Sequence, residues 1–176
     1  MAIHKNFPDN PFEILKPEER WFPADEILRE KGYQKLLPPL VDKIRREVKK
    51  FRDDGYQGAS GTSKSLLKYW FQTKKNINGI NFQYYFAQRE SIETLVYLTE
   101  IADIESKHDL LKYSSTDELE ENMFEEDWLR LVIKMATGSG KTKVLSLAIA
   151  WCYFNRLYEN SKKFARNFIL IAPNII

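Results

Sequence analysis

The sequence predicts an α/β fold in which a βαβ unit starts a parallel sheet and follows a mainly helical N-terminal region. Two apolar runs, LRLVIKM at residues 129–135 and FILIAP at residues 168–173, have the composition of strands buried on both faces. A glycine-rich turn and a helical pattern at residues 143–160 lie between them. A strand, a helix and a second strand in this order indicate a parallel pair with a right-handed crossover.

Four segments are expected along the 176 residues. Residues 1–35 form an irregular, proline-rich arm, residues 36–104 a helical lead-in, residues 105–127 an acidic insert or linker, and residues 128–176 the βαβ unit. Seven of the eleven residues at 117–127 are acidic, which is typical of an exposed segment.

The composition is that of a globular protein, with 43% apolar and 30% charged residues. The net charge of +2 is too small to indicate nucleic-acid binding from bulk charge. The single cysteine, Cys152, excludes an internal disulfide and cannot build a zinc site alone. No apolar run approaches the ~18–20 residues needed to span a bilayer, and the N-terminus lacks the apolar core of a signal peptide. We therefore expect a cytoplasmic protein without a membrane partner.

The first helix of the lead-in is indicated by apolar residues at spacings of three, four and three. These residues are Val41, Ile44, Val48 and Phe51. The opposite face of this helix is basic, with Lys43, Arg45, Arg46, Lys49 and Lys50. That face either contacts a phosphate backbone or is simply solvated, and solvation is the favoured interpretation.

Two further helices are expected in the lead-in. One covers residues 59–71 and is capped by Ser60 or Thr62. Its apolar side consists of Leu66, Leu67, Trp70 and Phe71. The other covers residues 87–103, with Ile92, Leu95, Val96 and Thr99 on one face. Between them, QTKKNINGIN is interpreted as a polar loop and FQYYF as a short strand or an extended lead-in.

The glycine-rich turn, ATGSGKT, has the chemistry of a phosphate-binding loop. Gly138 and Gly140 permit backbone conformations that other residues resist, so backbone N–H groups can converge on an anion at a helix N-terminus. Lys141 supplies a cation and Thr142 a hydroxyl for Mg²⁺, which makes them the expected catalytic pair. The residues expected to bind the phosphates are Thr137, Gly138, Ser139, Gly140, Lys141 and Thr142. Met135 stands where the strict phosphate-loop pattern has its first glycine.

MATGSGKT, with that methionine, resembles the first nucleotide-binding motif of superfamily 2 helicases, particularly the motor subunits of type I and type III restriction enzymes. The resemblance implies that residues 128–176 are an incomplete RecA-like helicase domain. APNII at the end of the second apolar run resembles the next helicase motif, Ia. It implies DNA contacts by Ala172, Pro173 and Asn174, and the alternative for these three residues is an ordinary strand-ending turn.

YYFAQRESIETLVYL resembles the same family, which carries a glutamine on a helix before the phosphate loop. The resemblance implies that Gln88 reads the edge of adenine, since its amide offers a donor and an acceptor. Arg89, Tyr85 or Phe86 would then stack on the base. Alternatively, Gln88 caps a helix or faces water. The lead-in also resembles the segment G-x-T-x-x-T-x-x-LL-x-x-W of type III restriction subunits, with serine at each threonine position.

These observations predict the start of a restriction-type helicase motor, which uses ATP and Mg²⁺ to move on DNA in defence against foreign DNA, with a methyltransferase as a further implied partner. An unrelated phosphate-loop ATPase or kinase is the second interpretation. A non-catalytic DNA- or partner-binding remnant is the third. No acidic motif that would hold Mg²⁺ and activate water follows the glycine-rich turn. We therefore expect an N-terminal piece of a larger protein that binds nucleotide at most weakly and does not hydrolyse it.

Overall fold

A computed structural model of the chain describes residues 10–15, 40–106, 108–114, 129 and 131–171. Most of the expected arm at residues 1–35 and most of the acidic insert lie outside these described residues. The elements, in chain order, are α2 (Val41–Asp53), α3 (Gly61–Phe71), β1 (Lys75–Ile77), β2 (Ile80–Phe82), α4 (Phe86–Val96), the π-helical turn η3 (Tyr97–Ile101), the 3₁₀ helix η4 (His108–Tyr113) and α5 (Lys141–Tyr158).

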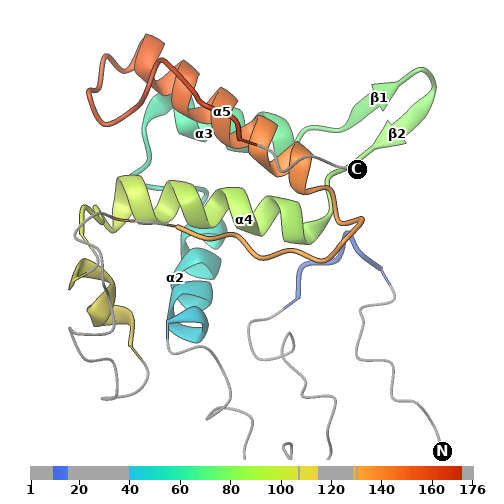
Figure 1. The fold of residues 1–176 in the computed structure, drawn as a ribbon. Coiled ribbons are helices and arrows are strands. Elements are labelled where there is room, and N and C mark those ends of the chain that lie inside the picture. Colours follow the sequence, from blue (N-terminus) through green and yellow to red (C-terminus); the bar gives the residue numbers. More distant parts are fainter. Residues whose placement is uncertain (1–9, 16–39, 107, 115–128, 130, 172–176) are drawn as a thin grey trace, which may run out of the picture.

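Helix α4 lies at the centre of the described structure (Figure 1). Helices α2, α3 and α5 all pack against it, and α3 also packs along α5. Ile92 and Val96 of α4 are fully buried, as their spacing predicts. The expected single helix over residues 87–103 is confirmed as α4 followed directly by η3.

Helix α2 confirms the predicted apolar face, because Val48 and Phe51 are buried. Its basic face is largely neutralised by neighbours on the same helix. Arg46 pairs with Asp42, Lys49 with Asp53, and Lys50 with Glu47. Lys43 donates to the backbone carbonyl of Lys112. This pairing supports the interpretation that the basic face of α2 is a solvated surface.

Helix α3 begins where the sequence predicts. The side chain of Ser60 accepts a hydrogen bond from the Ser63 N–H at 3.0 Å, which satisfies one of the free donors of the first turn. Leu67 and Trp70 are buried on its inner side. The second candidate cap, Thr62, instead donates its backbone N–H at 2.7 Å to Glu159, the residue that caps the C-terminus of α5.

The interpretation of QTKKNINGIN as a loop is wrong, because this segment contains an antiparallel hairpin. Strands β1 and β2 pair Lys75 with Phe82 and Ile77 with Ile80. The turn residues Asn78 and Gly79 both have positive φ, at 52° and 81°. Asn-Gly is the dipeptide that such a two-residue turn favours, so the sequence itself indicates this hairpin. The hairpin projects from the helical body (Figure 1).

The two apolar runs of the expected βαβ unit do not form strands in the described part of the chain. Residues 131–136 and 168–171 have no regular structure, and the sheet that the described residues form contains β1 and β2 alone. Val132 is 80% exposed and Ile169 is 88% exposed. A strand needs a neighbour for its backbone hydrogen bonds, and here neither run has one. Residues 131–136 instead extend along α4 (Figure 1).

A buried carboxylate ties α4 to the preceding elements. Glu93 has no exposed surface and accepts hydrogen bonds from Arg52 of α2 (2.7 Å), Arg89 of α4 (2.7 Å) and the Tyr56 hydroxyl (2.6 Å). Burial and the adjacent Glu93 carboxylate raise the pKa of Tyr56 far above its usual range, so this hydroxyl remains a donor. Two guanidinium groups thus share one carboxylate inside the protein.

Replacing Glu93 with alanine is expected to lower the free energy of unfolding by about 3–5 kcal/mol, because Arg89 would lose its carboxylate partner and Arg52 would keep only the longer contact to Glu90, at 3.7 Å. Urea denaturation followed by circular dichroism measures this change. Asp53→Ala, which removes the exposed pair with Lys49, is the control and should cost less than about 1 kcal/mol. Equal effects of the two substitutions would contradict the role given to Glu93.

Candidate functional site

The glycine-rich turn forms a tight loop immediately before α5. Gly138 and Gly140 have φ of +80° and +83°, a backbone region that side chains with a Cβ rarely adopt. Between them, Ser139 bonds back to the Ala136 carbonyl through its N–H (3.3 Å) and its Oγ (2.6 Å). The backbone conformations expected at both glycines are therefore present. Thr137 lies exposed on the loop.

The loop presents backbone donors at the N-terminus of a long helix. The Gly140 carbonyl accepts the N–H groups of Lys143 (2.9 Å) and Val144 (3.2 Å). Within the described residues, the N–H groups of Lys141 and Thr142 have no acceptor. Free N–H groups at the start of an 18-residue helix, together with the helix dipole, favour a bound anion.

Lys141 and Thr142 occupy the first turn of α5, and both are exposed. The Lys141 ammonium donates to the carbonyls of Met135 (3.3 Å) and Ala136 (3.1 Å), so it lies over the loop itself. These neutral carbonyls are weaker partners for an ammonium than an anion would be. The geometry thus places the cation and the free N–H groups around one small loop.

Gln88 reaches the loop from α4. Its Oε1 accepts the Tyr85 N–H at 3.0 Å, which caps the helix, and its Nε2 donates to the Ser139 carbonyl at 3.1 Å. The side chain is 7% exposed. A Cβ added to Gly140 would lie 2.1 Å from Gln88 Nε2. The amide therefore contacts the loop directly; the φ of residue 140 favours glycine, and a Cβ there would displace the Gln88 amide.

The described hydrogen bonds of the Arg89 guanidinium, unlike those of the Gln88 amide, are not to the loop. It is held in the buried cluster by Glu93 and by the Tyr56 hydroxyl at 3.0 Å. Phe86 is also buried, at 7% exposure. Tyr85 is 39% exposed and its ring lies 5.2 Å from the ring of Phe12. Among the residues expected to stack on a base, the structure thus leaves Tyr85 the most accessible.

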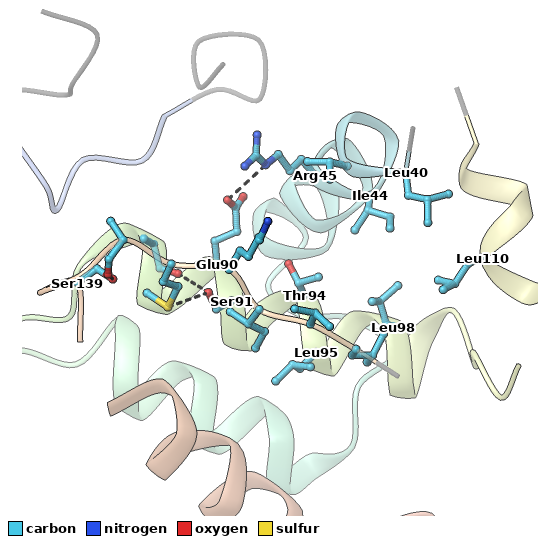
Figure 2. Close-up of a pocket in the computed structure, with 18 residues that line it drawn as sticks. Leu40, Ile44, Arg45, Glu90, Ser91, Thr94, Leu95, Leu98, Leu110 and Ser139 are labelled. Carbon is cyan, nitrogen blue, oxygen red and sulfur yellow. Dashed lines mark hydrogen bonds and ion pairs between the residues drawn. The ribbon is translucent and has the colours of Figure 1, made fainter. Parts of the chain in front are cut away.

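A cleft of about 620 Å³ lies behind the loop, between α2, α4 and residues 131–136 (Figure 2). Its walls are mainly apolar, and Ile44, Leu95 and Leu98 contribute to them. Ser91 contacts the Met135 sulfur at 3.9 Å, which fixes the chain that leads into the loop. The methionine in place of the motif's first glycine thus packs against α4.

A buried polar network holds α5 from the other side and was not predicted from the sequence. Ser63 of α3 accepts hydrogen bonds from Trp151 Nε1 (2.8 Å) and Asn155 Nδ2 (2.9 Å) of α5. Glu100 of η3 bonds to Ser63 Oγ and accepts from Trp151 Nε1 at 3.0 Å. Ser60 Oγ donates to Asn155 Oδ1 at 2.6 Å. The two serines of the lead-in pattern were the only sequence signal for this network.

Other sequence expectations have simpler outcomes. Ala172, Pro173 and Asn174 lie outside the described residues. Burial raises the pKa of the Cys152 thiol, in keeping with a packed side chain. Within the described ranges, no group of three or more His, Cys, Asp or Glu side chains is arranged to hold a metal ion. No helix among the described elements has the length and apolar character needed to cross a membrane.

A glycine-rich turn at the start of a long helix, contacted by a glutamine from a preceding helix, is the arrangement expected of the phosphate-loop class of proteins. The family model described as type III restriction enzyme, res subunit, matches residues 81–176, which is more than half of the chain. The chain belongs to this family, whose domain implies a RecA-like phosphate-loop fold. No curated protein and no solved structure gave a match in the same comparisons.

Gly140→Ala is expected to destabilise the chain more than Gly138→Ala. Both substitutions force a left-handed backbone on alanine, at about 1–2 kcal/mol each. Only the Cβ at position 140 would meet Gln88 and break its bond to Ser139, which adds about 1 kcal/mol. Urea denaturation of both variants measures the difference. As a check, both glycine variants are also measured with Gln88→Ala added. If Gly140→Ala were still less stable than Gly138→Ala by the same amount, the contact with Gln88 would not cause the extra loss of stability.

Proposed function

We propose that this chain binds ATP with Mg²⁺ through residues 137–142 and contributes this site to the DNA-translocating motor of a restriction endonuclease. Membership of the res-subunit family supports the helicase-type motor over an unrelated phosphate-loop ATPase or kinase. The observation that carries the proposal is the pair of left-handed glycines, which form a tight loop that has free N–H groups at the start of α5 and the Lys141 ammonium bonded to its carbonyls.

The residues present fit a triphosphate. A Cβ on Gly138 would meet nothing within 4 Å, so the loop is open on that side. The N–H groups of Lys141 and Thr142 are available as donors, and the Lys141 ammonium can exchange two neutral carbonyls for charged phosphate oxygens. The Thr142 hydroxyl is the proposed Mg²⁺ ligand. When bound, Mg²⁺ would share the charge of the phosphates.

Gln88 is proposed to select the base. Both ends of its amide currently bond to backbone groups, Oε1 to Tyr85 and Nε2 to Ser139. Adenine would offer the amide equivalent partners at its own edge. The exposed ring of Tyr85 is the proposed stacking surface, while Arg89 is retained in the Glu93 cluster and supports α4.

Hydrolysis is proposed to need a carboxylate from outside this segment of the protein. Residues 143–176 contain one acidic side chain, Glu159. Its carboxylate accepts the Thr62 N–H at 2.7 Å, at the far end of α5 from the loop, and hydrogen bonding by the side chain and the N–H of Thr62 lowers the pKa of Glu159. We therefore propose that the chain binds nucleotide without turning it over.

DNA is the proposed partner of the motor, with Ala172, Pro173 and Asn174 as proposed contacts to its phosphates. A methyltransferase subunit is a further proposed partner, and the cytoplasm is the proposed compartment. Family membership supports the first two proposals.

Lys141→Ala should weaken the binding of a fluorescent ATP analogue in the presence of Mg²⁺ by about tenfold to a hundredfold, because a charged hydrogen bond contributes about 1.5–3 kcal/mol. Fluorescence anisotropy measures the affinity. Lys143→Ala is the matched control, since it removes the same charge from the same exposed helical turn. A loss of similar size in both variants would mean that general charge, rather than a phosphate site, attracts the nucleotide.

Gln88→Ala should reduce the preference for ATP over GTP by about fivefold, which corresponds to about one hydrogen bond. Competition of each unlabelled nucleotide against the fluorescent analogue gives the ratio of affinities. Gln83→Ala, an exposed glutamine on the same connection, is the control. An unchanged ratio in Gln88→Ala would leave this glutamine with the structural role of holding Ser139 and would remove it from base selection.

A further inference from the structure

The lysines of α3 and the hairpin differ from those of α2 in their surroundings. Residues 55–89 contain five basic side chains and no aspartate or glutamate. The basic face of α2, by contrast, alternates with acidic partners that pair with it. The bulk charge of the chain hides this contrast, because the acidic residues are concentrated elsewhere.

The exposed members of this acid-free region lie on α3 and on the connection that follows it. Lys68 and Lys74 are exposed, Lys64 is half-buried, and none of the three forms an ion pair with any described residue. Tyr69, which follows Lys68 on the helix, is 58% exposed. We call Lys64, Lys68, Tyr69 and Lys74 the hairpin face.

Lys75 joins the helix to the hairpin beneath this surface. Its ammonium lies 4.4 Å from the ring centre of Tyr69 and 4.9 Å from that of Tyr84, and it donates to the Trp70 carbonyl at 3.3 Å. These contacts fix the orientation of the Tyr69 ring relative to the hairpin. An aromatic ring that is both exposed and held in place is suited to stacking.

A cleft of about 410 Å³, to which Lys74 contributes, lies between the end of α3 and β2. Its lining combines aromatic rings with side-chain amides and two lysines. Phe71 and Phe82 offer apolar faces there, while Gln72 and Asn81 offer donors and acceptors together. Such a lining suits flat heteroaromatic rings that carry hydrogen-bonding edges.

We propose that the hairpin face binds a single strand of nucleic acid, with phosphates on Lys64, Lys68 and Lys74 and a base on Tyr69. Unpaired lysines next to an exposed aromatic ring are the combination that single-strand binding requires, because the lysines follow the backbone and every base can stack. A single strand is favoured over a duplex because duplex bases are not free to stack on a side chain. The inference does not depend on the phosphate loop, and it adds a contact separate from residues 172–174.

The test is fluorescence anisotropy of the full 176-residue chain with a labelled 20-nucleotide oligothymidylate, across a range of salt concentrations and without nucleotide. The triple variant Lys64→Ala/Lys68→Ala/Lys74→Ala should bind at least about tenfold more weakly at low salt. The slope of log affinity against log salt should fall in magnitude by about 2, at about 0.7 for each lost contact to a single strand.

The α2 variant Lys43→Ala/Lys49→Ala/Lys50→Ala is the matched control, because it removes an equal number of positive charges from α2, where Lys49 and Lys50 are ion-paired and Lys43 donates to the Lys112 carbonyl. It should leave the slope unchanged. Tyr69→Ala should weaken binding by about five- to tenfold, and Tyr69→Phe should retain it, because stacking uses the ring. Circular dichroism establishes that each variant is folded.

Three outcomes would overturn the proposal: no binding of the oligothymidylate at low salt, equal losses in the two triple variants, or an affinity for a duplex of the same length equal to that for the single strand. Lys141→Ala should bind the strand normally. The failure of nucleotide binding and the failure of this inference are therefore distinguishable.

Discussion

The carboxylate of Glu93 is the constraint on which the described structure depends. It is fully buried at the middle of α4 and is bonded by side chains from α2, from α4 and from the turn between α2 and α3. A carboxylate in such a position is tolerable only because two guanidinium groups accompany it. Since α4 contacts every other long helix, fixing its position and rotation fixes the frame in which the loop is held.

The glycine-rich loop is positioned from two sides by this frame. On one side, the amide of Gln88 binds the Ser139 carbonyl, and Ser91 contacts Met135 just before the loop. On the other side, Trp151 and Asn155 tie the body of α5 to Ser63 of α3. Ser139 and Lys141 close the loop locally by bonding to the Ala136 carbonyl, and the neighbours that are distant in the sequence hold the loop in place. The lead-in thus helps to position the glycine-rich loop.

The sequence was sufficient for those features that local chemistry determines. The helical periods, the Ser60 cap and the conformations of Gly138 and Gly140 follow from residue type and spacing, and the structure confirms them. The placement of Gln88 next to the loop was suggested only by resemblance, because 51 residues separate it from Ser139. The spacing of Arg89 and Glu93 permits an i,i+4 pair, but the burial of that pair could not be foreseen, since Tyr56 and Arg52, which complete the cluster, are distant in the sequence. The hairpin was not predicted, because its strands contain lysine and asparagine, which are uncommon in strands, although Asn78-Gly79 is a favoured hairpin turn.

The apolar run at residues 169–171 has a consequence for the behaviour of the chain in solution. Ile169 and Ile171 are 88% and 91% exposed, and their backbone has no strand partner among the described residues. β-Branched segments with free backbone edges readily join the same segment of a neighbouring molecule. The chain should accordingly associate with itself as it is concentrated.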